Sequence, residues 1–139
     1  MAISLPSLIS RVRVALADVP TDMMDDIQVY RDIQRADDFI DEMIRSGTTE
    51  TMQEHTIVNL AAYYSYINYT SLAERQLGNV PAAAYLRIAA LKEIALAFLR
   101  LISDVPLTDN LVPDWVQLRK LKTMAYSTLS SSLEMSDYE

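Results

Sequence analysis

Apolar residues recur along most of the chain at spacings of three and four, which is the pattern of amphipathic helices. Three Val-Pro pairs and two glycines interrupt that pattern: Val19-Pro20, Val80-Pro81, Val105-Pro106, Gly47 and Gly78. Proline disfavours the helical conformation in the residue before it, and glycine suits the left-handed end of a helix. The sequence therefore predicts an all-α, single-domain bundle of about five helices, at approximately residues 5–17, 22–46, 51–77, 81–103 and 115–130.

Several of these helix ends carry a local signal. Thr21 is a candidate N-cap for the second helix, and we expect Gly47 to end that helix in the left-handed conformation. The segment from Thr51 to Glu54 fits a capping box at the start of the third helix, which we expect to end before Gly78.

The length of the chain, 139 residues, is enough for one domain with a hydrophobic core and short for two. We expect residues 1–104 to form the helical bundle. Residues 105–139 are expected to supply a linker, the last helix and a partner-docking tail of the same domain.

The third and fourth predicted helices are apolar on more than one side. In the third helix a second stripe lies across from the main apolar face and consists of Ala62, Tyr66, Tyr69 and Ala73. In the fourth helix Ala90, Ile94, Ala97 and Leu101 widen the apolar arc in the same way. Tyrosine is enriched at protein interfaces, so we take the first stripe as a candidate subunit contact, with packing inside this chain as the alternative.

The composition excludes several classes of function. Two glycines do not suffice for a phosphate-binding loop, and the absence of cysteine removes thiol catalysis and zinc clusters. The net charge of −7 disfavours a protein that coats nucleic acid. The most apolar run, Ile94 to Leu99, is far shorter than the roughly 20 residues that cross a bilayer. We expect no enzyme, no cofactor and no membrane attachment.

Acidic residues are concentrated between Asp18 and Glu54, a section that contains eleven acidic and three basic residues. Four of them are close enough on a helix to share a hard cation such as magnesium: Asp37, Asp38, Asp41 and Glu42. We interpret them as a solvated helix face, supported by Arg35 and Arg45 as pairing partners for Asp38 and Asp41, and keep a metal-dependent enzyme as an alternative. His55, with Met52 three and Thr51 four residues before it, lacks the Glu-x-x-His motif of a metal site and is expected at the surface or at the boundary of the core.

Three segments resemble the small helical head–tail connector proteins, or adaptors, of tailed bacteriophages and related viruses. They are the acidic helix opening Met23-Met24-Asp25-Asp26-Ile27, the helix segment Leu60-Ala61-Ala62-Tyr63-Tyr64, and the apolar helix from Pro81 to Ile102. The resemblance covers about residues 22–104 and includes no signature motif.

The resemblance implies a structural protein of the virion neck, made in the host cytoplasm. Its copies would form a ring of about a dozen below the portal, through which DNA passes without sequence-specific binding. A C-terminal segment would dock the portal, for which the candidate residues here are Trp115, Leu118, Arg119, Lys120, Leu121 and Lys122. A neck or tail-completion protein of the same particle, or a cellular helical adaptor that binds one partner helix, would show much the same sequence.

Overall fold

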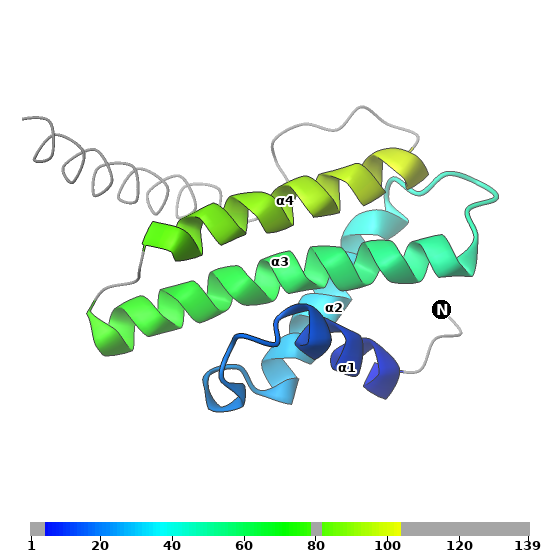
Figure 1. Ribbon diagram of the computed structural model, residues 1–139. Coiled ribbons are helices and arrows are strands. Elements are labelled where there is room, and N and C mark those ends of the chain that lie inside the picture. The colour runs from blue at the N-terminus through cyan, green and yellow to red at the C-terminus, as the bar shows by residue number, and fades with distance from the viewer. Residues whose placement is uncertain (1–4, 79–81, 104–139) are drawn as a thin grey trace, which may run out of the picture.

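The computed structural model describes residues 5–78 and 82–103, and this part of the chain is a helical bundle (Figure 1). Of the described residues 82% are helical and none lies in a strand, so the predicted all-α class is confirmed. The elements are α1 (Leu5–Ala15), a short 3-10 turn η1 (Thr21–Met23), α2 (Asp26–Asp41), α3 (Glu50–Leu77) and α4 (Ala82–Ile102). The predicted fifth helix, at residues 115–130, lies outside the described residues.

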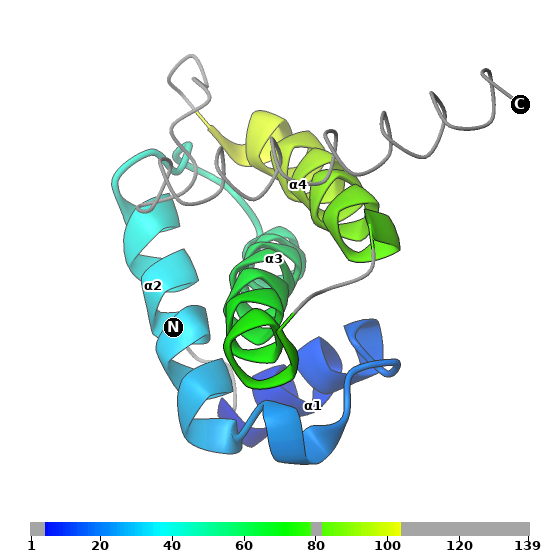
Figure 2. The same ribbon diagram turned by 90° about the vertical axis from the view of Figure 1, so that its left-hand side faces the viewer.

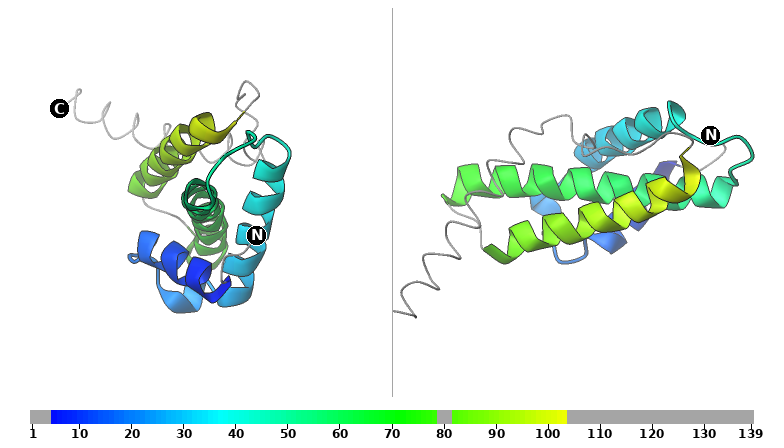
Figure 3. Two further views of the ribbon diagram at one scale, coloured as in Figure 1. Left: turned by 90° about the vertical axis from the view of Figure 1, so that its right-hand side faces the viewer. Right: turned by 90° about the horizontal axis from the view of Figure 1, so that it is seen from above.

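Helix α3 runs through the centre of the bundle. Figure 2 shows α2 and α4 on two sides of it and α1 crossing a third side. Seen from above, α3 and α4 run side by side in opposite directions (Figure 3). A helix with three neighbours needs apolar side chains around most of its circumference. This explains why the third predicted helix has two apolar stripes.

The start and end of α2 differ from the prediction. The carboxylate of Asp25 accepts a hydrogen bond from the amide of Gln28 at 2.8 Å and so caps α2, whereas Thr21 begins the 3-10 turn. Helix α2 ends at Asp41 rather than at residue 46. Gly47 does have a positive φ, of +87°, but it lies in the loop between α2 and α3. The expectation that Gly47 ends the helix is therefore wrong.

Because α2 ends at Asp41, the loop between α2 and α3 can contact the C-terminal end of α4. Ile44 forms an antiparallel bridge with Ser103, and the amide of Arg45 donates to the carbonyl of Ile102 at 2.6 Å. The guanidinium of Arg45 also donates to the carbonyl of Ser103 at 3.0 Å. The last carbonyls of a helix have no partner within it, and a cation there is favourable. We call these contacts the α4 clamp.

The ends of α3 are closer to the prediction. Thr49, rather than Thr51, is its N-cap and accepts from the amide of Met52 at 3.3 Å. Glu54 does not complete a capping box, because its carboxylate lies 3.5 Å from the guanidinium of Arg11 in α1. Gly78 follows the last residue of α3 with a φ of +82°, and its amide donates to the carbonyl of Glu74 at 3.0 Å. The predicted end is confirmed.

Candidate interaction surface

The outward face of α4 carries apolar side chains that no described residue covers. The exposed fractions of its three large side chains are 55% for Leu86, 44% for Ile94 and 62% for Leu101. With the exposed alanines of the same face they form what we call the α4 stripe: Ala83, Leu86, Ala90, Ile94, Ala97 and Leu101. The buried face of the same helix, around Ile88 and Ala95, packs into the core.

The α4 stripe is continuous along the helix. Its members are three to four residues apart, so they lie within less than a third of the circumference at 100° per residue. The exposed charges Glu93 and Arg100 flank it on one side and do not interrupt it. Three of its residues are alanines seven positions apart, which lets the backbone of another helix approach closely. The geometry therefore suits packing against a helix.

The four residues of the predicted subunit contact on α3 are mostly buried within this chain. Ala62, Tyr66 and Ala73 are only 1%, 5% and 4% exposed, and Tyr69 is half-buried. Within this chain, Ala62, Tyr66 and Ala73 therefore belong to the interior, and Tyr69 packs against the core from its edge. This burial agrees with the alternative of packing inside the chain, and a subunit contact through the stripe stays a prediction.

Arg87 of α4 is the side chain that closes this face. Its Nη2 atom lies 2.8 Å from Oδ1 of Asp18 and donates to the carbonyl of Ala15 at 3.1 Å, at the end of α1. The guanidinium carbon also stands 5.3 Å from the centre of the Tyr66 ring, within cation–π range. Burial raises the pKa of the Tyr66 hydroxyl, and the Asp18 carboxylate raises it further while Arg87 lowers it. The sequence offered no sign of this contact, since Arg87 lies far from Asp18 along the chain.

A second polar group, centred on Asp32, lies between α2 and α3. Asp32 is fully buried, and its carboxylate accepts hydrogen bonds from the hydroxyl of Ser65 at 2.7 Å and from the amide of Asn68 at 3.0 and 3.2 Å. The amide of Gln28 donates at 3.3 Å, and the guanidinium of Arg35 lies 3.6 Å away. Burial raises the pKa of Asp32, and these hydrogen bonds, with Arg35, oppose that rise.

The sequence analysis did not identify Asp32, although a signal was present. Asp32 occupies a position in the apolar stripe of α2, between Val29 and Ala36, where a charged residue needs buried partners. Ser65 and Asn68 interrupt the apolar face of α3 in the same way. Two polar interruptions on facing helices are what a buried hydrogen-bonded group requires. Its arrangement fixes the register of α2 against α3.

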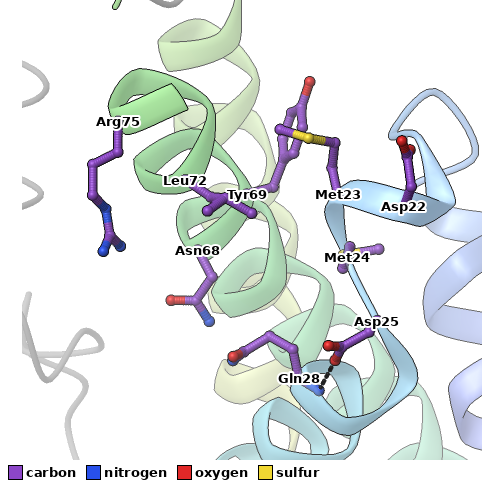
Figure 4. A pocket seen from close by; sticks show the side chains of 9 residues that line it. All are labelled: Asp22, Met23, Met24, Asp25, Gln28, Asn68, Tyr69, Leu72 and Arg75. Atoms are coloured by element: carbon purple, nitrogen blue, oxygen red, sulfur yellow. Dashed lines mark hydrogen bonds between the residues drawn. The ribbon is translucent and has the colours of Figure 1, made fainter. Parts of the chain in front are cut away.

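A cavity of about 240 Å³ lies beside the Asp32 group (Figure 4). Gln28 and Asn68, two of the donors to Asp32, line it, and Leu72 and Tyr69 of α3 add apolar surface. The carboxylates of Asp22 and Asp25 and the guanidinium of Arg75 make the rest of the lining mainly polar.

The acidic residues predicted as a solvated face lie near the end of α2. Asp38, Asp41 and Glu42 are exposed and Asp37 is half-buried, with its pKa raised by burial and by the neighbouring Asp41 and Asp38. Arg35 pairs with Asp32 instead of Asp38. Within residues 5–78 and 82–103, no group of three or more metal-ligating side chains is placed to hold an ion.

His55 is exposed in the first turns of α3, as predicted. Its Nδ1 atom lies 3.0 Å from Nη2 of Arg11, and its ring stacks on that of Phe98 with 6.1 Å between centroids. The candidate docking residues of the tail lie outside the described part of the chain: Trp115, Leu118, Arg119, Lys120, Leu121 and Lys122. None of the described helices combines the length and apolarity needed to cross a bilayer.

Comparison of the chain with protein-family models, with curated proteins and with solved structures finds no match.

Proposed function

We propose that the protein is a non-enzymatic connector subunit of a tailed-phage particle, which assembles into a ring at the neck between portal and tail. The observation that carries this proposal is the α4 stripe. Large apolar side chains that are 44% to 62% exposed along one helix face are typical of a surface that another chain covers. The resemblance of residues 22–104 to phage adaptors supports the same function.

A second exposed apolar pair supports a ring over a closed dimer. Val14 is 75% exposed and Ile27 is 64% exposed. Each directly follows one member of the ion pair between Arg13 and Asp26, whose side chains are 2.6 Å apart. Val14 and Ile27 belong to α1 and α2 and are not part of the α4 stripe. Two different apolar areas on one subunit fit a head-to-tail contact, and a head-to-tail contact can close into a ring.

The charge of the chain agrees with a conduit that DNA passes through. A net charge of −7 does not retain the phosphate backbone, so DNA would move through such a ring without being held. The candidate docking residues from Trp115 to Lys122 would attach the ring to the portal. The neck of the virion would then be the site of action.

The mass of the purified protein, measured by sedimentation with and without a purified portal ring, tests the proposal. We expect the wild-type chain to bind the portal as a ring of copies. Leu86→Asp and Val14→Asp should each prevent ring closure, while Arg31→Asp, a change at an exposed polar position of α2, should not. A wild-type chain that never binds the portal would contradict the proposal. A monomer in the absence of portal would not, because a connector can assemble only on its partner.

A further inference from the structure

The α4 stripe raises the question of what covers it before a ring forms. The described part of the chain ends at Ser103, one residue after α4, and residues 104–139 follow it. We propose that residues 115–130 of the same chain fold back as a helix antiparallel to α4 and cover the α4 stripe in the free protein. This inference rests on the proposed function for its consequence, because it names what occupies the assembly surface until a partner arrives.

The lengths of the two segments are similar. The α4 stripe from Ala83 to Leu101 spans 19 residues, and the predicted helix at 115–130 spans 16. At about 1.5 Å per residue they are about 28 Å and about 24 Å long. Residues 103–114 remain for the connection, and neighbouring antiparallel helices commonly need only about two to eight residues. The α4 clamp fixes the point at which this connection starts.

The sequence pattern of residues 115–130 matches the surface it would cover. Leu118, Leu121 and Ala125 recur at helical spacing and form one apolar side. An amphipathic helix in water needs a cover for that side, and the α4 stripe needs a cover of the same kind. The alanines of the α4 stripe leave room for the larger leucine side chains.

Charge favours this segment over a second copy of the bundle. The helix at 115–130 contains Arg119, Lys120 and Lys122 and no acidic residue. The described residues carry nine basic and thirteen acidic side chains, a net of −4, and exposed Glu93 flanks the α4 stripe. Like charge weakens a contact between two bundles, whereas a basic helix is attracted to the bundle. The segment 115–130 is therefore the better occupant in the absence of other proteins, although residues 104–139 as a whole contain six acidic and three basic side chains.

The consequence is a conditional assembly. The apolar residues that would cover the α4 stripe, such as Leu118 and Leu121, are also the candidate portal-docking residues. They cannot lie on α4 and on the portal together. Docking to the portal would therefore uncover the α4 stripe and permit contact with the neighbouring copy, so that rings form on the portal and not free in solution.

Trp115 provides the first test, because it is the only tryptophan of the chain and lies at the start of the proposed helix. In the whole 139-residue chain we expect Ile94→Asp to release the helix and shift the Trp115 emission to longer wavelength. Arg31→Asp, which places the same residue at an exposed position of α2, should leave the emission unchanged. Far-UV circular dichroism and a thermal melt of each variant show whether the bundle is intact.

Cysteine pairing provides a test that does not disrupt the surface. The natural chain has no cysteine, so a double variant can form one intramolecular disulfide only. In an antiparallel arrangement Ala90→Cys should pair with Ala125→Cys, and the yield should not depend on protein concentration. Asp38→Cys, on α2, paired with Ala125→Cys is the control and should not form the bond.

Two results would overturn the inference. A disulfide between chains, with a yield that rises with concentration, would show that a second copy covers the α4 stripe. An unchanged Trp115 emission in Ile94→Asp, together with no disulfide, would show that nothing covers it. Both measurements use the isolated protein, so they can fail while portal binding succeeds, or succeed while portal binding fails.

Discussion

The guanidinium of Arg87 in α4 lies 2.8 Å from the carboxylate of Asp18. The same guanidinium lies over the ring of Tyr66. The contact joins the C-terminal end of α1 to α4 across the face of α3. Helices α1 and α4 are neighbours of α3 rather than of each other (Figure 2). Arg87 therefore links the end of α1 to α4 over the Tyr66 ring of α3.

Removal of Arg87 should loosen the bundle without unfolding it. Arg87→Ala loses the ion pair with Asp18, the hydrogen bond to Ala15 and the contact with the Tyr66 ring. Because Asp18 is half exposed, we expect a loss of about 1–2 kcal/mol in the free energy of unfolding. Urea unfolding measures it. Arg31→Ala, at an exposed position of α2, should change it by less than about 0.5 kcal/mol; equal losses in the two variants would contradict the assigned role.

Substitution of Tyr66 should affect folding and not only assembly. The side chain is 5% exposed, so Tyr66→Ala leaves a space that the surrounding helices can fill only in part. We expect a loss of about 3–5 kcal/mol on urea unfolding, and Tyr66→Asp should be worse because it buries a charge. The conservative change Tyr66→Phe is the control. A Tyr66→Asp protein of native stability that fails only to assemble would return this residue to the subunit interface.

The Asp32 group should be costly to break from either helix. Asp32→Ala leaves the Ser65 hydroxyl and the Asn68 amide without their buried acceptor, which we expect to cost about 2–4 kcal/mol. Ser65→Ala should cost less, about 1–2 kcal/mol. A double-mutant cycle on the two residues should give a coupling energy above about 0.5 kcal/mol. Asp38→Ala, at an exposed position of the same helix, is the control.

The pH dependence of stability should carry the signature of Asp32. Burial raises its pKa above 3.8, so the folded chain retains a proton that the unfolded chain has already released. The stability that this carboxyl contributes is therefore greatest below pH 3.8 and declines as the pH rises through the folded-state pKa. The advantage of the wild type over Asp32→Asn should shrink over that range in urea unfolding. Asp37 titrates in both proteins, so its contribution cancels in the difference between them. If the advantage of the wild type grew with pH, the pKa of Asp32 would be lowered in the folded chain and the prediction would be wrong.

Tyr63 should tolerate the loss of its hydroxyl. Its ring is fully buried in the core, and its hydroxyl has no hydrogen-bond partner among the described residues. Burial also raises the pKa of this hydroxyl, so it stays neutral. Because a buried hydroxyl without a partner is unfavourable, Tyr63→Phe should leave the free energy of unfolding unchanged or raise it by about 1 kcal/mol. Tyr30→Phe is the comparison, because the half-buried Tyr30 hydroxyl accepts a hydrogen bond from the Gln34 amide at 2.6 Å, and it should be the less favourable of the two changes. A clear destabilisation by Tyr63→Phe would reveal a partner.

The sequence was sufficient for the four described helices and for most of their ends. Proline, glycine and helical spacing are local signals, and they placed α1, α3 and α4 within a few residues. The end of α2 was wrong because a long-range contact competes with the helix there, between Ile44 and Ser103. A local signal such as Gly47 cannot register a partner that is distant in the chain.

Of the candidate surface, the sequence predicted the existence of excess apolar faces but not which face stays open. Tyr66 and Ile94 each lie on the additional apolar stripe of their helix. Only the structure shows that Tyr66 is covered by Arg87 and the end of α1, whereas Ile94 is 44% exposed. Helical spacing gives the direction of a side chain from its own axis. It does not give the position of the neighbouring helices, which depends on the whole chain.

The α4 clamp has a consequence for how such a chain can change over time. Arg45 and Ile44 contact Ser103, the last described residue before the C-terminal segment, and both lie in the loop between α2 and α3. The segment after Ser103 can thus be replaced, lengthened or retargeted as a module while the bundle is inherited intact. A change in the loop, in turn, would redirect whatever segment is attached there, without altering a single residue of it.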